Sequence, residues 1–224
     1  MKNGTYYATQ LKKLYGRLSQ SLSAPVVPGP TDPVMQLVTA ILGVGCSDAE
    51  GERAVQQALK TLVDLNEMRV SSAHELNKAM GNMIPDGVRR CQCVIDALQA
   101  VFDRENKLSL DRLRGLGRRE ARHYLEQLKG VDHYAAASVT LWSLGGHAIP
   151  VNDGLLQALR DEKVVNQTSD RQEVQAFLER HIGAADAKAF CLVMRAFAET
   201  GRHGPKKGRG GAAARAVGGV PSEE

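Results

Sequence analysis

A glycine-centred turn is the part of the sequence whose residues best suit ligand binding. One predicted helix ends in the run from Tyr124 to Lys129, Gly130 and Val131 follow, and a second helix, rich in alanine, begins by His133. A turn of this kind directs free backbone N–H groups and the positive end of a helix dipole at one place, which suits a phosphate group. Such contacts hold DNA without reading its base sequence. An ordinary pair of antiparallel helices joined at a glycine has the same pattern, so the turn alone leaves both interpretations open.

The cysteines limit the other kinds of chemistry. Cys46, Cys91, Cys93 and Cys191 have no paired ligand spacing, which argues against a disulfide framework, a zinc site or an iron–sulfur cluster. We therefore expect reduced and mostly buried thiols, no metal site and no cofactor. The densest basic run of the folded part lies between Arg112 and Arg122.

Length and charge indicate a globular chain with one basic end. The 224 residues are 43% hydrophobic and 24% charged, which is typical of globular domains and excludes a wholly disordered chain. The net charge is +4, and residues 201–224 supply most of it through five basic and two acidic residues. With its seven glycines, this segment is predicted to be a disordered tail. It is either a plain flexible terminus or an arm that adds non-specific phosphate contacts.

Nothing in the sequence predicts membrane insertion or secretion. The longest weakly polar stretch, Val34–Cys46, is shorter than the roughly 20 apolar residues that a membrane helix needs. Residues 1–20 alternate polar, aromatic and basic side chains, unlike a signal peptide. We therefore expect a cytoplasmic protein that has no membrane partner.

Apolar residues recur at helical rather than alternating spacing, which predicts an all-α fold of about ten helices. Asp32 and Pro33 are a typical helix start, and Ser72 with Glu75 forms a capping-box pattern. The expected helices lie near residues 7–18, 34–42, 48–63, 72–81, 88–102, 134–144, 153–159, 170–181 and 184–199, with two short helices within 108–128.

Three segments together resemble a known protein family. They are Asp32-Pro33 through Ile41-Leu42 to Ser47-Asp48, Leu108–Leu113 leading to Leu128–Val131, and Leu144–Val151 before Asn152-Asp153. In order and spacing they resemble the helix-hairpin-helix (HhH-GPD) superfamily of DNA glycosylases, in its endonuclease III-like branch. The resemblance implies two helical lobes with a DNA-binding cleft between them. Residues 33–144 would form the lobe that contains the hairpin, and residues 1–32 with 145–200 the other.

The resemblance places the candidate catalytic residues at Tyr134, Asn152 and Asp153. Tyr134 matches the lysine that forms a Schiff base in bifunctional members, and a phenol cannot form an imine, so lyase activity by that route is not expected. The family's catalytic aspartate matches Asn152 in an ungapped alignment and Asp153 if the preceding glycine turn is one residue longer. Asp153 with Gly154 is similar to the adenine-glycosylase branch, which favours Asp153. Either residue could instead simply cap the helix that follows.

The resemblance also implies which residues contact DNA. Asp132 stands where the hairpin has its second glycine, and its charge would repel a phosphate. Gly45 stands where the family has a glutamine, and it has no side chain to fill the gap left by a flipped base. The family's four-cysteine iron–sulfur loop is missing. The candidate DNA-binding residues are Lys129, Gly130, Val131, Asp132, His133, Gly45, Arg89 and Arg90.

These observations predict a monofunctional DNA N-glycosylase of base excision repair. It would be a hydrolase that binds double-stranded DNA as a monomer and uses Asp153 as its carboxylate. The alternative is a catalytically degenerate relative that still binds DNA, which Asn152, Tyr134, Gly45 and Asp132 favour. A third hypothesis is a helical protein-interaction module, because the chain before residue 201 is nearly neutral.

Overall fold

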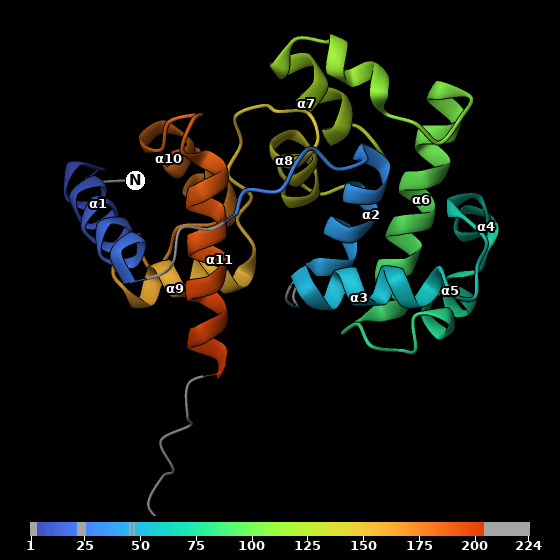
Figure 1. The fold of residues 1–224 in the computed structure, drawn as a ribbon, viewed down its shortest axis with the longest axis horizontal. Coiled ribbons are helices and arrows are strands. Elements are labelled where there is room, and N and C mark those ends of the chain that lie inside the picture. Colours follow the sequence, from blue (N-terminus) through green and yellow to red (C-terminus); the bar gives the residue numbers. More distant parts are fainter. Residues whose placement is uncertain (1–3, 22–25, 45, 47, 204–224) are drawn as a thin grey trace, which may run out of the picture.

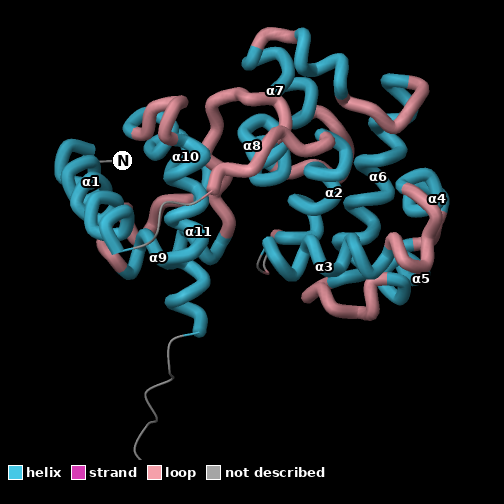
Figure 2. Tube along the Cα trace, viewed as in Figure 1, coloured by secondary structure: helices cyan, strands magenta, loops and turns pink. Residues whose placement is uncertain are grey.

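The computed structural model describes residues 4–21, 26–44, 46 and 48–203, and every regular element in these ranges is a helix (Figure 1, Figure 2). Among the described helices, none combines the length and the apolar composition that crossing a bilayer requires. The predicted all-α fold is confirmed. In chain order the elements are α1 (Gly4–Ser21), α2 (Pro33–Gly43), α3 (Asp48–Ala58), α4 (Leu65–Val70), α5 (Ala73–Ala79), α6 (Gly87–Glu105), the 3₁₀ helix η1 (Asp111–Gly115), α7 (Arg118–Glu126), α8 (His133–Trp142), α9 (Asp153–Asp161), α10 (Arg171–His181) and α11 (Ala187–His203).

Side-chain caps explain where several helices begin. The carboxylate of Asp32 accepts a hydrogen bond from the N–H of Met35 at 2.7 Å, and Pro33 occupies the first turn of α2. Ser72 and Glu75 form the predicted capping box at the start of α5. Because a cap satisfies N–H groups that have no partner within the helix, these starts are encoded locally.

The helix expected over residues 48–63 is shorter in the structure. It ends at Ala58, and the separate helix α4 follows. Asp64 begins α4 by accepting hydrogen bonds from the N–H groups of Asn66 at 2.8 Å and Glu67 at 3.0 Å. A short polar side chain of this kind competes with the backbone of a continuing helix and stabilises a new start instead.

The last helix is longer than predicted. Helix α11 continues to His203, so the disorder predicted from Gly201 onward is wrong for residues 201–203. A single glycine costs a helix about 1 kcal/mol, which is too little to end it when the rest of the helix is packed. Residues 204–224, the remainder of the predicted tail, lie outside the described residues.

Buried apolar side chains form two groups, which we name the hairpin cluster and the terminal cluster. The hairpin cluster contains buried residues from α2 through α8, and the terminal cluster contains buried residues from α1, α8, α9, α10 and α11. Figure 1 shows the two groups of helices side by side. The predicted lobes of residues 33–144 and of residues 1–32 with 145–200 stay a prediction.

Helix α8 contributes to both clusters. Every residue from Tyr134 to Trp142 is buried. A helix that is buried on all sides needs small or apolar residues around its whole circumference. The small residues Ala135 to Ser138 meet part of this need. The hairpin cluster contains Tyr134, Ala135, Ala136 and Val139, and the terminal cluster contains Ala137, Leu141 and Trp142.

Candidate functional site

The predicted turn at Gly130 joins α7 to α8. After α7 the chain tightens through two hydrogen bonds, from the N–H of Leu128 to the carbonyl of Leu125 at 3.1 Å and from the N–H of Val131 to the carbonyl of Leu128 at 3.2 Å. Helix α8 begins at His133, directly after the turn. The structure therefore contains the helix-hairpin-helix that the sequence predicted.

Gly130 is the residue type that this turn requires. Its φ of +81° is in the left-handed region, which a residue with a Cβ adopts only at a cost. The turn also packs on the backbone of α6. A Cβ at Gly130 would overlap the carbonyl oxygen of Cys93 and lie 3.0 Å from its carbonyl carbon. This contact holds the hairpin against the first half of α6, where Arg89 and Arg90 lie.

Asp132 lies between the turn and α8 and caps that helix. One of its carboxylate oxygens accepts a hydrogen bond from the N–H of Ala135 at 2.8 Å. The positive end of α8 is thus partly neutralised by a charge of the protein itself. The hairpin is consequently a weaker phosphate site than one with glycine at this position.

A pocket of about 380 Å³ lies where the hairpin meets the starts of α6, α9 and α10. Three aspartates and three arginines contribute to its wall, so it can attract a phosphate and still present a carboxylate. Five residues of the predicted site lie in this wall: Gly130, Asp132, Arg89, Arg90 and Asp153. Ile41, Val44, Asp86, Cys93 and Arg171 complete the lining.

The structure separates the roles of the two candidate residues at the start of α9. The side-chain oxygen of Asn152 accepts a hydrogen bond from the N–H of Leu155 at 2.8 Å, so Asn152 caps the helix. The side chain of Asp153 is 63% exposed, and Asp153 lines the pocket. Its Oδ1 lies 3.6 Å from Nε of Arg171. Of the two, Asp153 is the one that faces the pocket beside the hairpin.

Arg171 is a pocket residue that the sequence analysis missed. It begins α10 directly after the capping residue Asp170. Its Nη1 is buried without a hydrogen-bond partner among the described residues, while its Nε faces Asp153. A buried cationic donor without an acceptor favours an incoming anion. No local pattern marks this residue, because it reaches the pocket only through the packing of α10 beside the hairpin.

Arg89 and Arg90 differ in what they can do. Arg90 donates hydrogen bonds to the carbonyl of Pro85 at 3.1 Å and to the carbonyl of Ile41 at 3.2 Å, so it joins α2 to α6. Arg89 is 82% exposed, and its Nη1 lies 3.4 Å from Asp86. Because exposed ion pairs of this kind contribute little to stability, Arg89 is available to a phosphate.

Three further predicted DNA-binding residues, Lys129, Val131 and His133, lie outside the wall of this pocket. Val131 is half-buried and packs against the hairpin cluster. Lys129 is exposed, and its Nζ lies 3.2 Å from Oδ1 of Asp96. His133 is exposed as well, and its Nδ1 lies 3.4 Å from Oε1 of Glu126. Lys129 can therefore add positive charge beside the turn without entering the pocket. Gly45 lies outside the described residues.

Tyr134, the third predicted catalytic residue, does not line the pocket of about 380 Å³. Its side chain is only 6% exposed and belongs to the hairpin cluster. It lines a cavity of about 80 Å³ whose wall also includes Asp132 and Arg171, and a second cavity of about 140 Å³. Tyr134 thus borders both of these cavities. The second cavity is bounded by Pro28, Thr31, Gln36, Thr39, Ala40, Glu52, Ser138, Trp142, Leu192 and Arg195.

Sequence comparisons give one distant relative. No family model matches the chain. A protein of Arabidopsis thaliana that is provisionally named a DNA glycosylase is 22% identical over 148 residues, which are 65% of this chain and 50% of that protein. The chain thus spans about half the length of this curated relative.

Solved structures show what fold the helices form. A trapped covalent intermediate of endonuclease III with DNA matches with a TM-score of 0.68 at 16% identity, over 85% of both chains. The 8-oxoguanine glycosylase/lyase of Clostridium acetobutylicum, in complex with double-stranded DNA, matches with a TM-score of 0.67 at 13% identity, over 90% of this chain and 71% of that one. At such identities the likeness concerns the fold. The chain therefore has the helix-hairpin-helix (HhH-GPD) fold of the endonuclease III-like DNA glycosylases, as its three sequence segments predicted.

Proposed function

We propose that this protein is a DNA glycosylase of base excision repair, which binds damaged double-stranded DNA and hydrolyses the N-glycosidic bond of an extruded base. The observation that carries the proposal is the pocket in which Gly130 of the hairpin, three arginines and the carboxylate of Asp153 meet. The fold neighbours solved with DNA support the same class of function. Because one fold hosts many functions, the residues of the pocket carry more weight than the fold.

The arginines of the pocket account for binding to the DNA backbone. Arg89 is exposed, and Arg171 has a buried donor atom that finds no acceptor in the described part of the chain. Each cation that neutralises a phosphate releases a counterion, so duplex affinity should fall steeply as the salt concentration rises. Contacts of this kind position the duplex without reading its sequence, as a protein that searches for damaged bases requires.

Asp153 supplies the chemistry in this proposal. Breaking the glycosidic bond builds positive charge on the deoxyribose, and a nearby carboxylate stabilises that charge and can activate water. The 3.6 Å separation between Asp153 and Arg171 is too long for a hydrogen bond. A phosphate that draws Arg171 away would therefore free the carboxylate when DNA binds.

Tyr134 and Trp142 provide the place for the base. Base-processing enzymes extrude their target from the helix and stack it against aromatic or apolar side chains. The cavity of about 140 Å³ has Tyr134 and Trp142 in its wall. Because Tyr134 has no amine, we propose hydrolysis without the lyase step.

A specific observation favours a second candidate, a DNA-binding protein that has lost catalysis. Asn152 uses its side chain to cap α9, and Asp153 faces Arg171, which partly neutralises it. In that case the scaffold would bind a damaged site without cutting the glycosidic bond. The pocket and its arginines would keep their role.

Excision of bases from a panel of damaged duplexes tests the proposal. If Asp153 is the catalytic carboxylate, Asp153→Asn should lower the single-turnover excision rate by about 10²–10⁴-fold. Asn152→Ala should not abolish excision, because it removes only the cap of α9. Asn152→Asp keeps the cap and adds a carboxylate. Excision that appears only in Asn152→Asp would identify the degenerate relative.

Duplex binding separates the remaining hypothesis from these two. Salt-dependent binding to an abasic-analogue duplex without excision selects the degenerate protein. The absence of binding at low salt would overturn both and leave the protein-interaction module. The cytoplasmic location, the monomeric state and the lack of a cofactor or iron–sulfur cluster stay predictions.

A further inference from the structure

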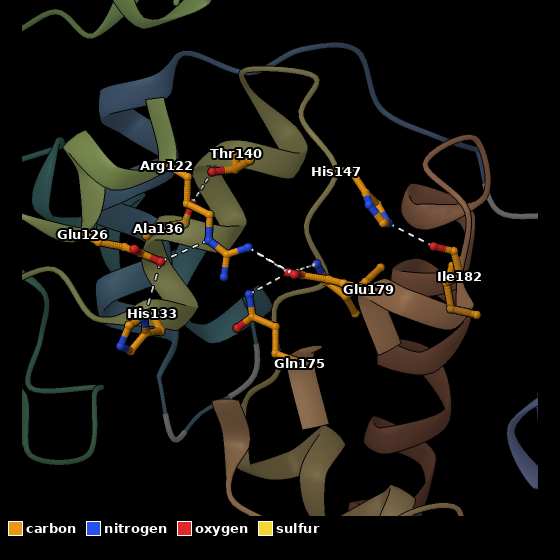
Figure 3. Close-up of polar contacts among 10 residues, drawn as sticks. Arg122, Glu126, His133, Ala136, Thr140, His147, Gln175, Glu179 and Ile182 are labelled. Atoms are coloured by element: carbon orange, nitrogen blue, oxygen red, sulfur yellow. Dashed lines mark hydrogen bonds and ion pairs between the residues drawn. The ribbon is translucent and has the colours of Figure 1, made fainter. Parts of the chain in front are cut away.

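An ion pair joins the two groups of helices beside the pocket. Arg122 lies on α7 and Glu179 lies on α10, and Nη1 of Arg122 is 3.1 Å from both carboxylate oxygens of Glu179. The side chains are 28% and 20% exposed, so water screens the pair less than it screens a pair on the open surface. In Figure 3 the side chains of Arg122 and Glu179 extend toward each other from the two groups of helices.

On the side of α7, the ion pair continues to the hairpin. Nε of Arg122 donates to Oε1 of Glu126 at 3.0 Å. The same oxygen of Glu126 lies 3.4 Å from Nδ1 of His133, the first residue of α8. The guanidinium of Arg122 therefore contacts two carboxylates, and one of them also touches the residue that follows the turn (Figure 3).

On the side of α10, the ion pair continues to the segment that leads into α9. Oε1 of Glu179 accepts hydrogen bonds from the backbone N–H of Ile149 at 3.2 Å and from Nε2 of Gln175 at 2.8 Å. Ile149 lies in the non-helical segment between α8 and α9, and this segment leads to Asp153 at the start of α9. Within this segment, His147 also contacts the carbonyl of Ile182 at 2.9 Å (Figure 3). Side chains of α10 and its C-terminal end thus hold a segment that has no helical hydrogen bonds of its own.

We propose that Arg122 and Glu179 are positioning residues, whose ion pair fixes the segment before Asp153 relative to the hairpin that holds the duplex. The proposal rests on the proposed function, because it concerns where the carboxylate meets the bound deoxyribose. Neither side chain lines the pocket of about 380 Å³, so their effect must act through geometry. Displacement of a reacting group by about 1 Å can cost a factor of about 100 in rate.

Glu179→Gln tests the proposal. Glutamine keeps the length of the side chain and an oxygen for Ile149, but it removes the charge that Arg122 contacts. We expect the single-turnover excision rate to fall by about 100-fold, while the Kd for an abasic-analogue duplex changes by less than about threefold. The matched control is Glu162→Gln, which breaks the ion pair between Glu162 and Arg17 at 2.6 Å, away from α7 and the hairpin. An excision rate that matches the control would overturn the proposal.

A double-mutant cycle separates positioning from general destabilisation. If the two residues act as one unit, Arg122→Ala together with Glu179→Gln should lose no more rate than Arg122→Ala alone, which also removes the contact with Glu126. Arg122→Lys should retain more rate than Arg122→Ala. Additive losses would show that the pair does not act as a unit and would contradict the proposal.

A distance measurement decides the proposal even if the protein excises no base. Spin labels on Glu120→Cys in α7 and Gln157→Cys in α9, in a Cys93→Ser background, report the separation of the hairpin side from the helix that carries Asp153. Glu179→Gln should broaden the distribution of that distance, and Glu162→Gln should leave it unchanged. An unaltered distribution in Glu179→Gln would refute the positioning role, whatever the excision assay shows.

Discussion

Replacing Gly130 with alanine tests whether the hairpin depends on its contact with α6. The φ there is +81°, and a left-handed backbone costs a residue with a Cβ about 1–2 kcal/mol. The new methyl group would also overlap the carbonyl oxygen of Cys93, and overpacking of this kind costs about 1–3 kcal/mol. We therefore expect Gly130→Ala to lower the free energy of unfolding by about 2–5 kcal/mol and to weaken duplex binding, since the turn must move off α6.

Gly145→Ala is the matched control for this prediction. Gly145 also has a positive φ, +65°, but a Cβ there would meet no atom of the described residues within 4 Å. It should therefore show the backbone cost alone, about 1–2 kcal/mol, with duplex binding unchanged. Urea denaturation followed by circular dichroism gives both free energies of unfolding, and fluorescence anisotropy of a labelled duplex gives the affinities. Equal destabilisation by the two variants would refute the steric argument.

Three further predictions concern caps, pH and thiols. Asp132→Ala should lower the free energy of unfolding by about 1 kcal/mol through the lost cap yet tighten duplex binding, because it removes a negative charge from the pocket; weaker binding in low salt would contradict this. Hydrogen bonds from Arg112 hold the pKa of Glu105 below its ordinary 4.5. The stabilisation relative to Glu105→Gln should thus be complete above pH 4.5 and be lost as the pH falls through the lowered pKa, which acid titration of unfolding checks. Burial raises the pKa of Cys91 to about 12, so maleimide at pH 7 should leave Cys91 unmodified while half-buried Cys93 reacts, and bound duplex should protect Cys93; mass spectrometry of the labelled peptides decides.

The local parts of the fold could be predicted from the sequence because they depend on neighbouring residues. The capping box of Ser72 and Glu75 and the helix start at Asp32 need only residues three positions apart, and both are present. The separate helix α4 was missed because the apolar spacing continues through Val63, whereas the side chain of Asp64 caps a new helix. The end of α11 was placed at a glycine, although packing along the rest of the helix carries it to His203.

The candidate site was harder to predict because its residues come from the hairpin turn and from four helices, α2, α6, α9 and α10. Sequence reasoning could place Gly130 at a turn and could offer Asn152 and Asp153 as alternatives, since each suits a helix start. Only the packing shows that Asn152 caps the helix and that Asp153 opens into the pocket. Arg171 could not be found for the same reason, because its distance from the hairpin along the chain carries no local signal. The catalytic and DNA-binding roles of these residues stay predictions.

Because α8 belongs to both hydrophobic clusters, it also determines how the protein unfolds. A fragment cut after residue 144 would leave Leu141 and Trp142 bare to water, and the complementary fragment would lack the helix that completes its interior. Heat or denaturant should therefore melt both halves in a single cooperative transition. Truncation would yield aggregating pieces instead of independent domains, and damage to the distant α11 would loosen the hairpin as well.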